Sequence, residues 1–287
     1  MGWLVTLTGA VVVLVILRDL FHTLWHPTRH GGLSRMVMTA LWRLLSSRHS
    51  VRAAGLVGPL GMVGVVVMWA VGVTVGWALV YWPHMPEAFS FSSALEPDEH
   101  AGPLDALYVS LVIVATLGLG DIAPEEGWLR IVAPLEGLVG FALLTATVSW
   151  ILGIYPALTR RRTLALRVGH LRHADPALPQ LDSGTGAAVL DRLADDIARV
   201  CVDFVQYPES YYFHDGVGDI SLARTIHHAA DLAEEAKRAR HTDVRFAASV
   251  LSAALDDLAA VLDERFLHTK GDRDAVLAAY ARDHDGS

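Results

Sequence analysis

The chain has 287 residues, 53% of them hydrophobic, and a mean hydropathy of +0.37. A soluble protein of this size is seldom so apolar, so the composition indicates a membrane protein. The net charge of −8 argues against nucleic-acid binding, and the single cysteine, Cys201, excludes an intrachain disulfide and a cysteine-rich metal site.

The apolar residues are concentrated before residue 160, in three runs with little or no charge, whereas the rest of the chain is rich in Asp, Arg and Ala. This distribution predicts a membrane half and a soluble half. The first run starts at Gly2, and its helical pattern extends to about His26, where Pro27 is expected to end it. It lacks the basic start and the cleavage site of a signal peptide, so we interpret it as a retained spanning helix.

Arginine dominates the loop that follows. Residues 18–52 contain six arginines and one acid, Asp19. By the positive-inside rule this loop is predicted to be cytoplasmic, with the N-terminus outside. Whether Asp19 does more than pair with Arg18 stays open. Apolar residues at helical spacing predict a helix along the inner membrane interface: Leu33, Met36, Val37, Leu41, Leu44 and Leu45.

Three histidines, His22, His26 and His30, lie four residues apart in this region. A metal site or a pH-sensing site is one interpretation. Ordinary interfacial histidines are favoured, because Pro27 breaks the helix that would align the three rings.

The second run, residues 53–83, carries no charge and is long enough to span the membrane. Gly72 and Gly76 in this run allow another helix to approach closely. Residues 53–129 contain no Lys or Arg but eight acids. This predicts an acidic outer face that concentrates cations at an entrance, although a soluble loop explains most of these acids equally well.

Residues 103–115 are too few to cross the bilayer but are typical of a helix, with Pro103 at its first position and Asp105 in its first turn. We predict a pore helix that enters from outside and directs the negative end of its dipole toward an ion path.

A six-residue segment follows, made of Thr116, Leu117, Gly118, Leu119, Gly120 and Asp121. Glycine adopts positive φ without steric cost, so glycine at alternate positions lets successive carbonyl oxygens face the same side. Four such strands around an axis make rings of oxygens that replace the water shell of a monovalent cation. The Thr116 hydroxyl would add one more ring, and Asp121 would lie at the outer mouth. A glycine-rich turn between buried helices is the alternative.

This segment resembles the filter of the potassium-channel pore family, which reads Thr-Val-Gly-Tyr-Gly-Asp. The resemblance covers roughly residues 55–159. It implies a prokaryotic two-transmembrane, pore-loop channel with an additional N-terminal helix and a helical cytoplasmic domain. Leu119 replaces the family's usual tyrosine, whose hydroxyl braces the filter against the pore helix. The resemblance therefore supports a cation pore more firmly than strict potassium selectivity.

The third span is predicted at residues 128–155, with Arg160, Arg161 and Arg162 at its inner end. Apart from Arg130 near its start, Glu136 is its one charge, and a carboxylate in hydrocarbon must find partners within the protein. We expect it to reach the back of the filter and to hydrogen-bond there, with the Ser110 or the Tyr108 hydroxyl. The alternative is that Glu136 satisfies backbone groups freed by a kink at Pro134.

The resemblance implies one further feature of the third span, a glycine hinge, and helical spacing indicates another. Gly140 matches the glycine hinge of the family's inner helix. Phe141, Leu144, Val148 and Leu152 follow on the same face at helical spacing. A hydrophobic constriction that closes by dewetting is favoured for Leu152, and for the other three residues a constriction and core packing are equally good interpretations.

Residues 163–287 show amphipathic helical patterns and no strand pattern, which predicts a cytoplasmic helical bundle. The apolar positions are Leu190, Leu193, Ile197, Val200 and Phe204, then Ile220, Ala223, Ile226 and Leu232, then Val250, Leu251, Leu255, Leu258, Val261 and Leu262. His227, His228 and Asp231 have the spacing of a small metal site. A simple histidine pair is favoured, because no further ligands are evident.

The sequence thus predicts an all-α membrane protein with three transmembrane helices, a re-entrant pore helix and filter loop, and a cytoplasmic helical bundle. The predicted divisions are residues 1–52, 53–159 and 160–287, with a short basic connector before the bundle. We expect a homotetramer in the plasma (cell inner) membrane that contacts lipid and conducts K+ passively. No cofactor, no metal beyond K+, no nucleic-acid partner and no enzyme activity are expected. The alternatives are a non-selective monovalent cation channel and a membrane-anchored helical enzyme or sensor.

Overall fold

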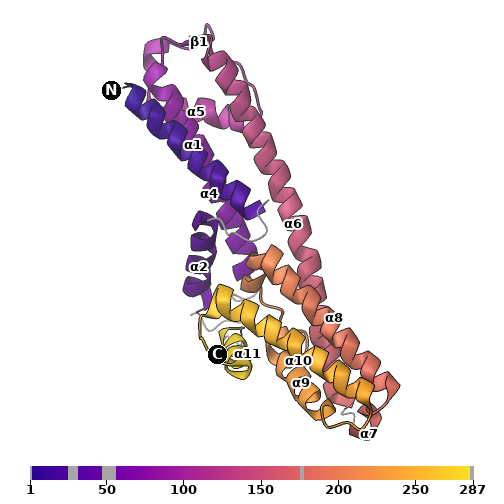
Figure 1. Ribbon diagram of the computed structural model, residues 1–287. Helices are drawn as coiled ribbons and strands as arrows, with labels where there is room; N and C mark the ends of the chain where they lie inside the picture. The colour runs from indigo at the N-terminus through magenta and orange to yellow at the C-terminus, as the bar shows by residue number, and fades with distance from the viewer. Residues whose placement is uncertain (1, 25–31, 47–55, 175–177, 217, 285–287) are drawn as a thin grey trace. The chain divides into compact units, whose positions relative to one another are not determined.

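The computed structural model describes residues 2–24, 32–46, 56–174, 178–216 and 218–284. The regular secondary structure of these residues is helical apart from one two-stranded sheet, so the predicted all-α class is confirmed (Figure 1). Three helices in the described part of the chain are long and apolar enough to cross a membrane: α1 (Gly2–Leu24), α4 (Val57–Tyr81) and α6 (Leu129–Ala174). The chain is a multi-pass membrane protein.

The other elements are shorter or more polar. They are α2 (Gly32–Ser46), η1 (Trp82–His84), β1 (Phe89–Phe91), η2 (Pro97–Glu99), α5 (Pro103–Val114), β2 (Ile122–Pro124), α7 (Leu178–Leu181), α8 (Gly184–Gln206), η3 (Pro208–Tyr212), α9 (Leu222–Ala236), α10 (Thr242–Leu262), the π-helical turn η4 (Asp263–Leu267) and α11 (Arg273–His284). The interfacial helix and the pore helix of the sequence prediction correspond to α2 and α5. The sheet was not predicted, because strands of three residues leave no alternating pattern.

The chain divides into two compact units, one of residues 1–37 and 63–151 and the other of residues 38–62 and 152–287. Helices α2, α4 and α6 each continue from one unit into the other. The division at residues 52 and 159 that the sequence indicated stays a prediction, and residue 52 lies outside the described residues.

Helix α6 corrects one expectation. It is a single helix of 46 residues, so the short basic connector expected after the third span is wrong. Arg160, Arg161 and Arg162 lie within this helix. Arg160 donates two hydrogen bonds to Asp203 at 2.8 and 2.5 Å, and Arg161 donates one to Asp215 at 2.6 Å. Arginine is a good helix former, so these residues do not interrupt the helix.

In the first unit, α1 packs closely against α4 (Figure 1). A Cβ added at Gly9 would lie 2.4 Å from the Gly76 carbonyl oxygen, and one at Gly72 would lie 2.7 Å from Ile16. The predicted close approach at Gly72 and Gly76 is confirmed. Lipid gives helices no hydrophobic drive to associate, so small residues that allow backbone contact are the main source of packing.

Asp19 joins three helices of this unit. Its carboxylate accepts hydrogen bonds from the Leu33 and Ser34 amides at 2.9 and 3.2 Å and from the Trp69 indole at 2.9 Å. Leu33 and Ser34 form the first turn of α2, whose amides have no partner within the helix. Asp19, which is 5% exposed, therefore caps α2 from α1 and holds both helices to α4.

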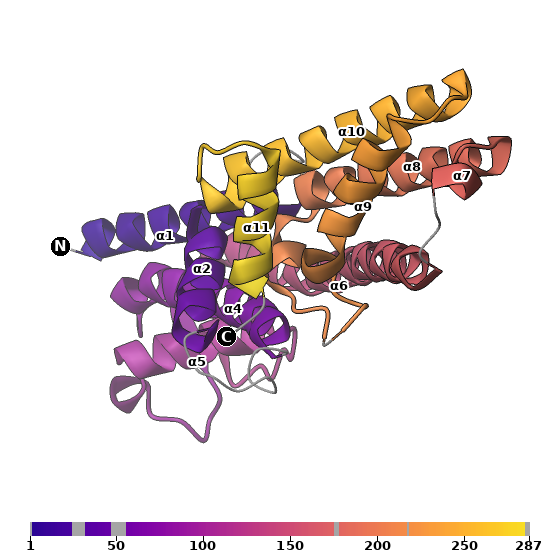
Figure 2. The same cartoon turned by 90° about the horizontal axis from the view of Figure 1, so that it is seen from below.

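The second unit contains the predicted bundle. Helices α8 and α10 lie side by side, with α9 and α11 packed on them (Figure 2). The bundle core includes the predicted residues Leu190, Leu193, Ile197, Val200, Phe204, Ala223, Ile226, Leu251, Leu255, Leu258 and Leu262. Ile220 and Val250 are each 39% exposed, so these two core predictions are wrong. Ile220 precedes α9, which begins at Leu222.

The second histidine-containing pattern, of His227, His228 and Asp231, is partly assembled. The rings of His227 and His228 lie 4.0 Å apart, and His228 Nδ1 lies 3.9 Å from Asp231. In the described ranges, no group of three potential ligands comes together as a metal site.

The capping role of Asp19 gives a stability prediction. Asp19→Leu removes the cap of α2 and leaves the buried Trp69 indole without an acceptor, which should cost about 2–4 kcal/mol. We expect thermal unfolding of the detergent-solubilised protein to move down by about 4–8 °C. Arg18→Gln, on the exposed neighbouring residue, is the matched control and should leave the midpoint nearly unchanged. Equal midpoints for the two variants would contradict the capping role.

Candidate functional site

The candidate site begins with α5, whose start is fixed by one carboxylate. The Gly102 amide donates to Asp105 Oδ2 at 3.1 Å, and His100 Nδ1 lies 3.1 Å from Oδ1 of the same side chain. Pro103 occupies the first helical position, where no amide proton is needed. Pro103 and Asp105 therefore begin the helix as the sequence indicated.

Backbone hydrogen bonds join the 116–121 segment to the C-terminal end of α5. The Thr116 amide donates to the Ile113 carbonyl at 2.9 Å, and the Leu117 amide donates to the Val112 carbonyl at 2.9 Å. This pair of bonds is the Schellman pattern, in which the residue after the helix is left-handed. Thr116, with a φ of 56°, takes that conformation. The segment thus starts as the cap of α5.

Positive φ recurs at every second residue of the segment. The values are 56° at Thr116, 58° at Gly118 and 76° at Gly120, while Leu117 and Leu119 are not left-handed. The positive φ predicted for the two glycines is confirmed. The left-handed Thr116 was not predicted, because this conformation costs a residue with a Cβ about 1–2 kcal/mol. The two hydrogen bonds that end α5 hold it there.

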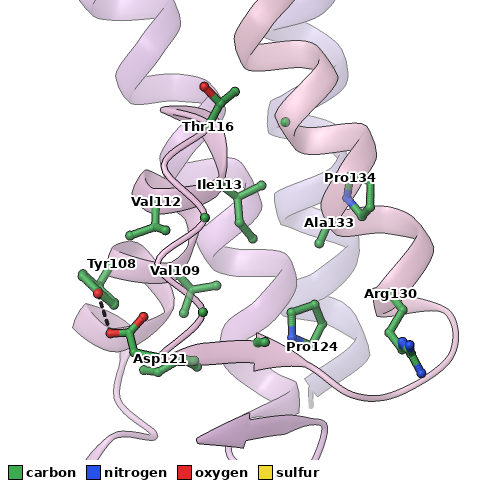
Figure 3. A pocket seen from close by; sticks show the side chains of 15 residues that line it. Tyr108, Val109, Val112, Ile113, Thr116, Asp121, Pro124, Arg130, Ala133 and Pro134 are labelled. Atoms are coloured by element: carbon green, nitrogen blue, oxygen red, sulfur yellow. Dashed lines mark hydrogen bonds between the residues drawn. The ribbon is translucent and has the colours of Figure 1, made fainter. Parts of the chain in front are cut away.

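A small sheet and a side-chain bond hold the other end of the segment. The strand β2 follows Asp121 directly and pairs with β1, with Phe91 opposite Ile122, and the Ser92 amide donates to the Asp121 carbonyl at 2.8 Å. The Tyr108 hydroxyl on α5 donates to Asp121 Oδ2 at 2.5 Å (Figure 3). This hydrogen bond lowers the pKa of Asp121, so its carboxylate is ionised at neutral pH.

A cavity of about 450 Å³ lies beside the segment, bordered by α5, β2 and the first turns of α6 (Figure 3). Its walls are mainly apolar, and Gly118 and Gly120 border it. The side chains of Leu117 and Leu119, by contrast, are 64% and 61% exposed. Within one chain, the segment therefore lies at a surface with its two leucines uncovered.

Glu136 of α6 is fully buried behind the site. Its two carboxyl oxygens each accept one hydrogen bond of 2.5 Å, one from the Tyr81 hydroxyl of α4 and one from the Ser110 hydroxyl of α5. Ser110 Oγ also lies 2.9 Å from the Thr74 carbonyl oxygen. One carboxyl group therefore joins α4, α5 and α6, at a depth where no water is available to replace any of these bonds.

The expected partners of Glu136 need one correction and one addition. The bond to Ser110 is present, but Tyr108 does not reach Glu136, because its hydroxyl is directed to Asp121. Tyr81 was missed as a partner. The sequence offered only a weak signal for it, because an aromatic residue at the end of a span is usually interpreted as an interface anchor. The backbone at Pro134 is not a partner of Glu136 among the described contacts. Filter support by Glu136, Ser110 and Tyr108 stays a prediction.

The predicted hinge and constriction lie further along α6. A Cβ added at Gly140 would lie 2.1 Å from the Val114 carbonyl oxygen, so glycine is required there for α6 to pass the end of α5. This close contact is a packing reason for Gly140 that is independent of any hinge. The Leu152 side chain is 68% exposed within the chain, and Phe141 and Leu144 are 63% and 64% exposed.

The series His22, His26 and His30 is only partly visible. His22 lies in the last turn of α1. His26 and His30 lie outside the described residues.

The hydrogen bonds of Glu136 predict how two substitutions differ. Glu136→Leu leaves the buried Tyr81 hydroxyl without an acceptor and should cost about 1–3 kcal/mol. Glu136→Gln should stay within about 1 kcal/mol of the parent. Its carbonyl oxygen can accept from Tyr81 and its amide can donate to Ser110, which leaves the single Ser110 proton for Thr74.

The measurement is the thermal unfolding midpoint of the purified protein, with Tyr81→Phe as a variant that removes one bond. We expect the midpoints to fall in the order Glu136→Gln, Tyr81→Phe, Glu136→Leu. A Glu136→Leu protein that unfolds at the temperature of the parent would show that the carboxyl group does not hold the helices together.

Comparison with known proteins identifies the same region. Residues 64–155 match the family model described as "Ion channel". An uncharacterized membrane protein of Bacillus subtilis (strain 168), YdjJ, is 29% identical over 157 residues, which cover 54% of this chain and 45% of that relative. No solved structure matches the chain significantly. The matched residues include α5, the 116–121 segment and the part of α6 that carries Glu136 and Gly140.

Proposed function

We propose that this chain is one subunit of a homotetrameric potassium channel, because residues 64–155 match the family model described as "Ion channel" and the 116–121 segment resembles a potassium-channel filter. K+ passes down its electrochemical gradient through the 116–121 segments of four subunits, with Leu152 at the constriction. The observation that carries the proposal is the alternation of positive φ at Thr116, Gly118 and Gly120, directly after the C-terminal end of α5. Alternation of this kind aligns backbone carbonyl oxygens, which are ligands for a dehydrated monovalent cation.

The electrostatics of the segment favour a cation. The C-terminal end of α5 carries the negative end of the helix dipole, and Thr116 follows it directly. At the opposite end the ionised Asp121 carboxylate adds a negative charge next to the path. An anion would meet repulsion at both ends of the segment.

The requirement for several chains follows from the exposure of the segment. Non-helical backbone at membrane depth is tolerated only where protein or a water-filled path covers it. Leu117 and Leu119 are mostly exposed in one chain, and one carbonyl from each chain cannot surround an ion. Four copies around an axis supply the ring and cover the leucines and the neighbouring cavity.

The orientation in the membrane is proposed from charge. Arginines cluster in residues 18–52 and acids in residues 87–126, so the positive-inside rule puts α2 and the bundle in the cytoplasm and the Asp121 end of the segment outside. The N-terminus then lies outside, in the plasma membrane of the cell.

A non-selective monovalent cation channel is the second candidate. The observation in its favour is Leu119, which has no hydroxyl to brace the segment, so the rings can adjust to ions of different size. Reversal potential in proteoliposomes with K+ on one side and Na+ on the other separates the two candidates. A reversal potential close to the K+ equilibrium potential supports potassium selectivity, and one near zero supports the non-selective pore.

The same preparation tests the role of the segment. Gly118→Ala should reduce K+ flux at least tenfold without dissolving the tetramer, because a Cβ disfavours the left-handed conformation by about 1 kcal/mol in each of four subunits. Within one chain no atom lies within 4 Å of the added Cβ, so there the effect is conformational rather than steric.

Gly127→Ala is the matched control, because Gly127 has equal space for a Cβ and its φ is not positive. Its flux should equal that of the parent. Flux that is normal in Gly118→Ala, in a protein that remains tetrameric by chemical cross-linking, would overturn the assignment of the segment as the ion path.

A further inference from the structure

Residues 207–215, between α8 and α9, contact the start of α4 and the middle of α6 within the second unit. A Cβ added at Gly153 of α6 would lie 2.7 Å from the Tyr207 hydroxyl, and one at Gly58 of α4 would lie 2.5 Å from the Phe213 ring. Both aromatic side chains therefore lie directly against helix backbone. The 207–215 segment therefore packs on α4 and on α6 in the same way, with an aromatic ring against a glycine.

The same segment contacts α2. The Tyr212 hydroxyl lies 3.2 Å from the Thr39 hydroxyl, and the His214 ring stacks on Trp42 with centroids 4.8 Å apart. Trp42 is buried, so α2 contributes an aromatic surface that the 207–215 segment covers. The parts of α2, α4 and α6 that belong to the second unit thus all contact the 207–215 segment of the same unit.

Arg161 of α6 binds the backbone of this segment. Its guanidinium donates to the Ser210 and Phe213 carbonyls, both at 2.7 Å, and to Asp215 at 2.6 Å. Arg161 is 2% exposed and Asp215 is 7% exposed. A buried guanidinium needs all of these acceptors, so movement of the segment would leave a charge without compensation.

The last helical residue of α11, His284, closes this arrangement. Its Nε2–H donates to the Tyr211 carbonyl at 2.9 Å, and its ring lies 5.3 Å from the Trp42 ring between centroids. Both the neutral Nε2–H tautomer and the imidazolium can make this bond, so the surroundings of Nδ1 decide between them. In the part of the chain that the structure describes, the buried Nδ1 has no hydrogen-bond partner. A proton on Nδ1 would make the ring a cation, and this new N–H would have no hydrogen-bond acceptor among the described residues.

The groups that face His284 do not favour a cation. Arg161 of α6 and His214 after η3 oppose a positive charge, and Asp283 of α11 favours one, while Tyr211 of η3 contributes its carbonyl as acceptor. Asp283 is already used, because it accepts a hydrogen bond from the Tyr211 hydroxyl at 2.6 Å. Tyr280 and Trp42 complete the surroundings with aromatic rings.

We infer that His284 is an acid-sensitive latch: the neutral imidazole holds α11 and the 207–215 segment against α2, α4 and α6, and its protonation releases them. The effect on conduction rests on the proposed channel function. Gly153 directly follows Leu152, so the segment contacts α6 next to the proposed constriction. Release removes this contact and the carbonyl acceptors of Arg161, so the part of α6 next to Leu152 gains freedom to move and ion flux rises.

Linkage sets the pH range. Burial, together with the Arg161 guanidinium, lowers the pKa of His284 from 6.5 to about 4 in the docked state. In the released state the ring is exposed and its pKa returns to the ordinary value of about 6.5. Between these values release takes up a proton, so docking is complete above 6.5 and weakens about tenfold per pH unit as the pH falls toward 4.

The experiment uses the full chain in lipid nanodiscs and in proteoliposomes. Hydrogen exchange of residues 207–216 and 273–284 is measured at pH 7.5 and 5.5, corrected for the intrinsic exchange rate, and K+ flux is measured with the same pH on both sides. We expect about tenfold more opening at pH 5.5 and a higher flux. Neither change should occur in His284→Gln. His170→Gln, on an exposed position of α6, is the control and should behave like the parent. If His284→Gln does not fold, His284→Met is the second non-titrating variant.

The two readouts separate the possible failures. The latch is overturned if the corrected exchange rates of the parent are the same at both pH values. It is also overturned if His284→Gln shows the same pH response as the parent. Exchange that responds while flux does not overturns the coupling to α6. Absence of K+ flux in every variant, with the pH-dependent exchange intact, would instead overturn the proposed channel function and leave the latch standing.

Discussion

The structure of the membrane unit depends on one buried carboxyl group. Glu136 accepts hydrogen bonds from Tyr81 on α4 and Ser110 on α5, so a single side chain of α6 joins three helices behind the 116–121 segment. At this depth an unmade hydrogen bond has no water to replace it, so these bonds are more restrictive than apolar contacts. They fix the rotation of α5 about its axis. This rotation sets where the last carbonyls of α5 accept the hydrogen bonds of the Thr116 and Leu117 amides. The contact of Gly140 with Val114 then fixes how closely α6 approaches that end.

The same principle recurs at the other end of the membrane unit. Asp19 holds the first turn of α2 and the Trp69 indole, as Glu136 holds Tyr81 and Ser110. Between these two carboxyl groups, α1 and α4 pack through glycines rather than large side chains. Lipid does not drive apolar helices together, so small residues and a few buried polar groups must do so. Both acids are costly in isolation, and each is stabilising only because all of its partners are in place.

Electrostatic pairing links α6 to the bundle in a different way. Arginines along the second half of α6 pair with aspartates of the bundle unit: Arg160 with Asp203, Arg161 with Asp215, Arg167 with Asp196 and Arg172 with Asp219. Most of these pairs are partly exposed and contribute little stability each. Arg161 differs because it is buried and binds two backbone carbonyls as well. It makes the 207–215 segment and α6 one structural element, and this gives His284 a route to the helix that carries Leu152.

The sequence by itself determined the three apolar spans, the short helix α5, the glycine alternation and the amphipathic pattern of the bundle, because each follows from local periodicity or from the φ preference of glycine. It also indicated that Glu136 needs a partner, since a charge within a span always does. Only the tertiary structure decided which partner. Tyr81 lies 55 positions away from Glu136, and Tyr108, which seemed equally able to reach it, is held by Asp121 instead. Nothing local in the chain marks such a choice. Contacts between distant residues likewise decided the cap that Asp19 provides for α2 and the burial of His284. These contacts give hydrogen-bond partners to polar groups that the sequence pattern alone would place at the surface.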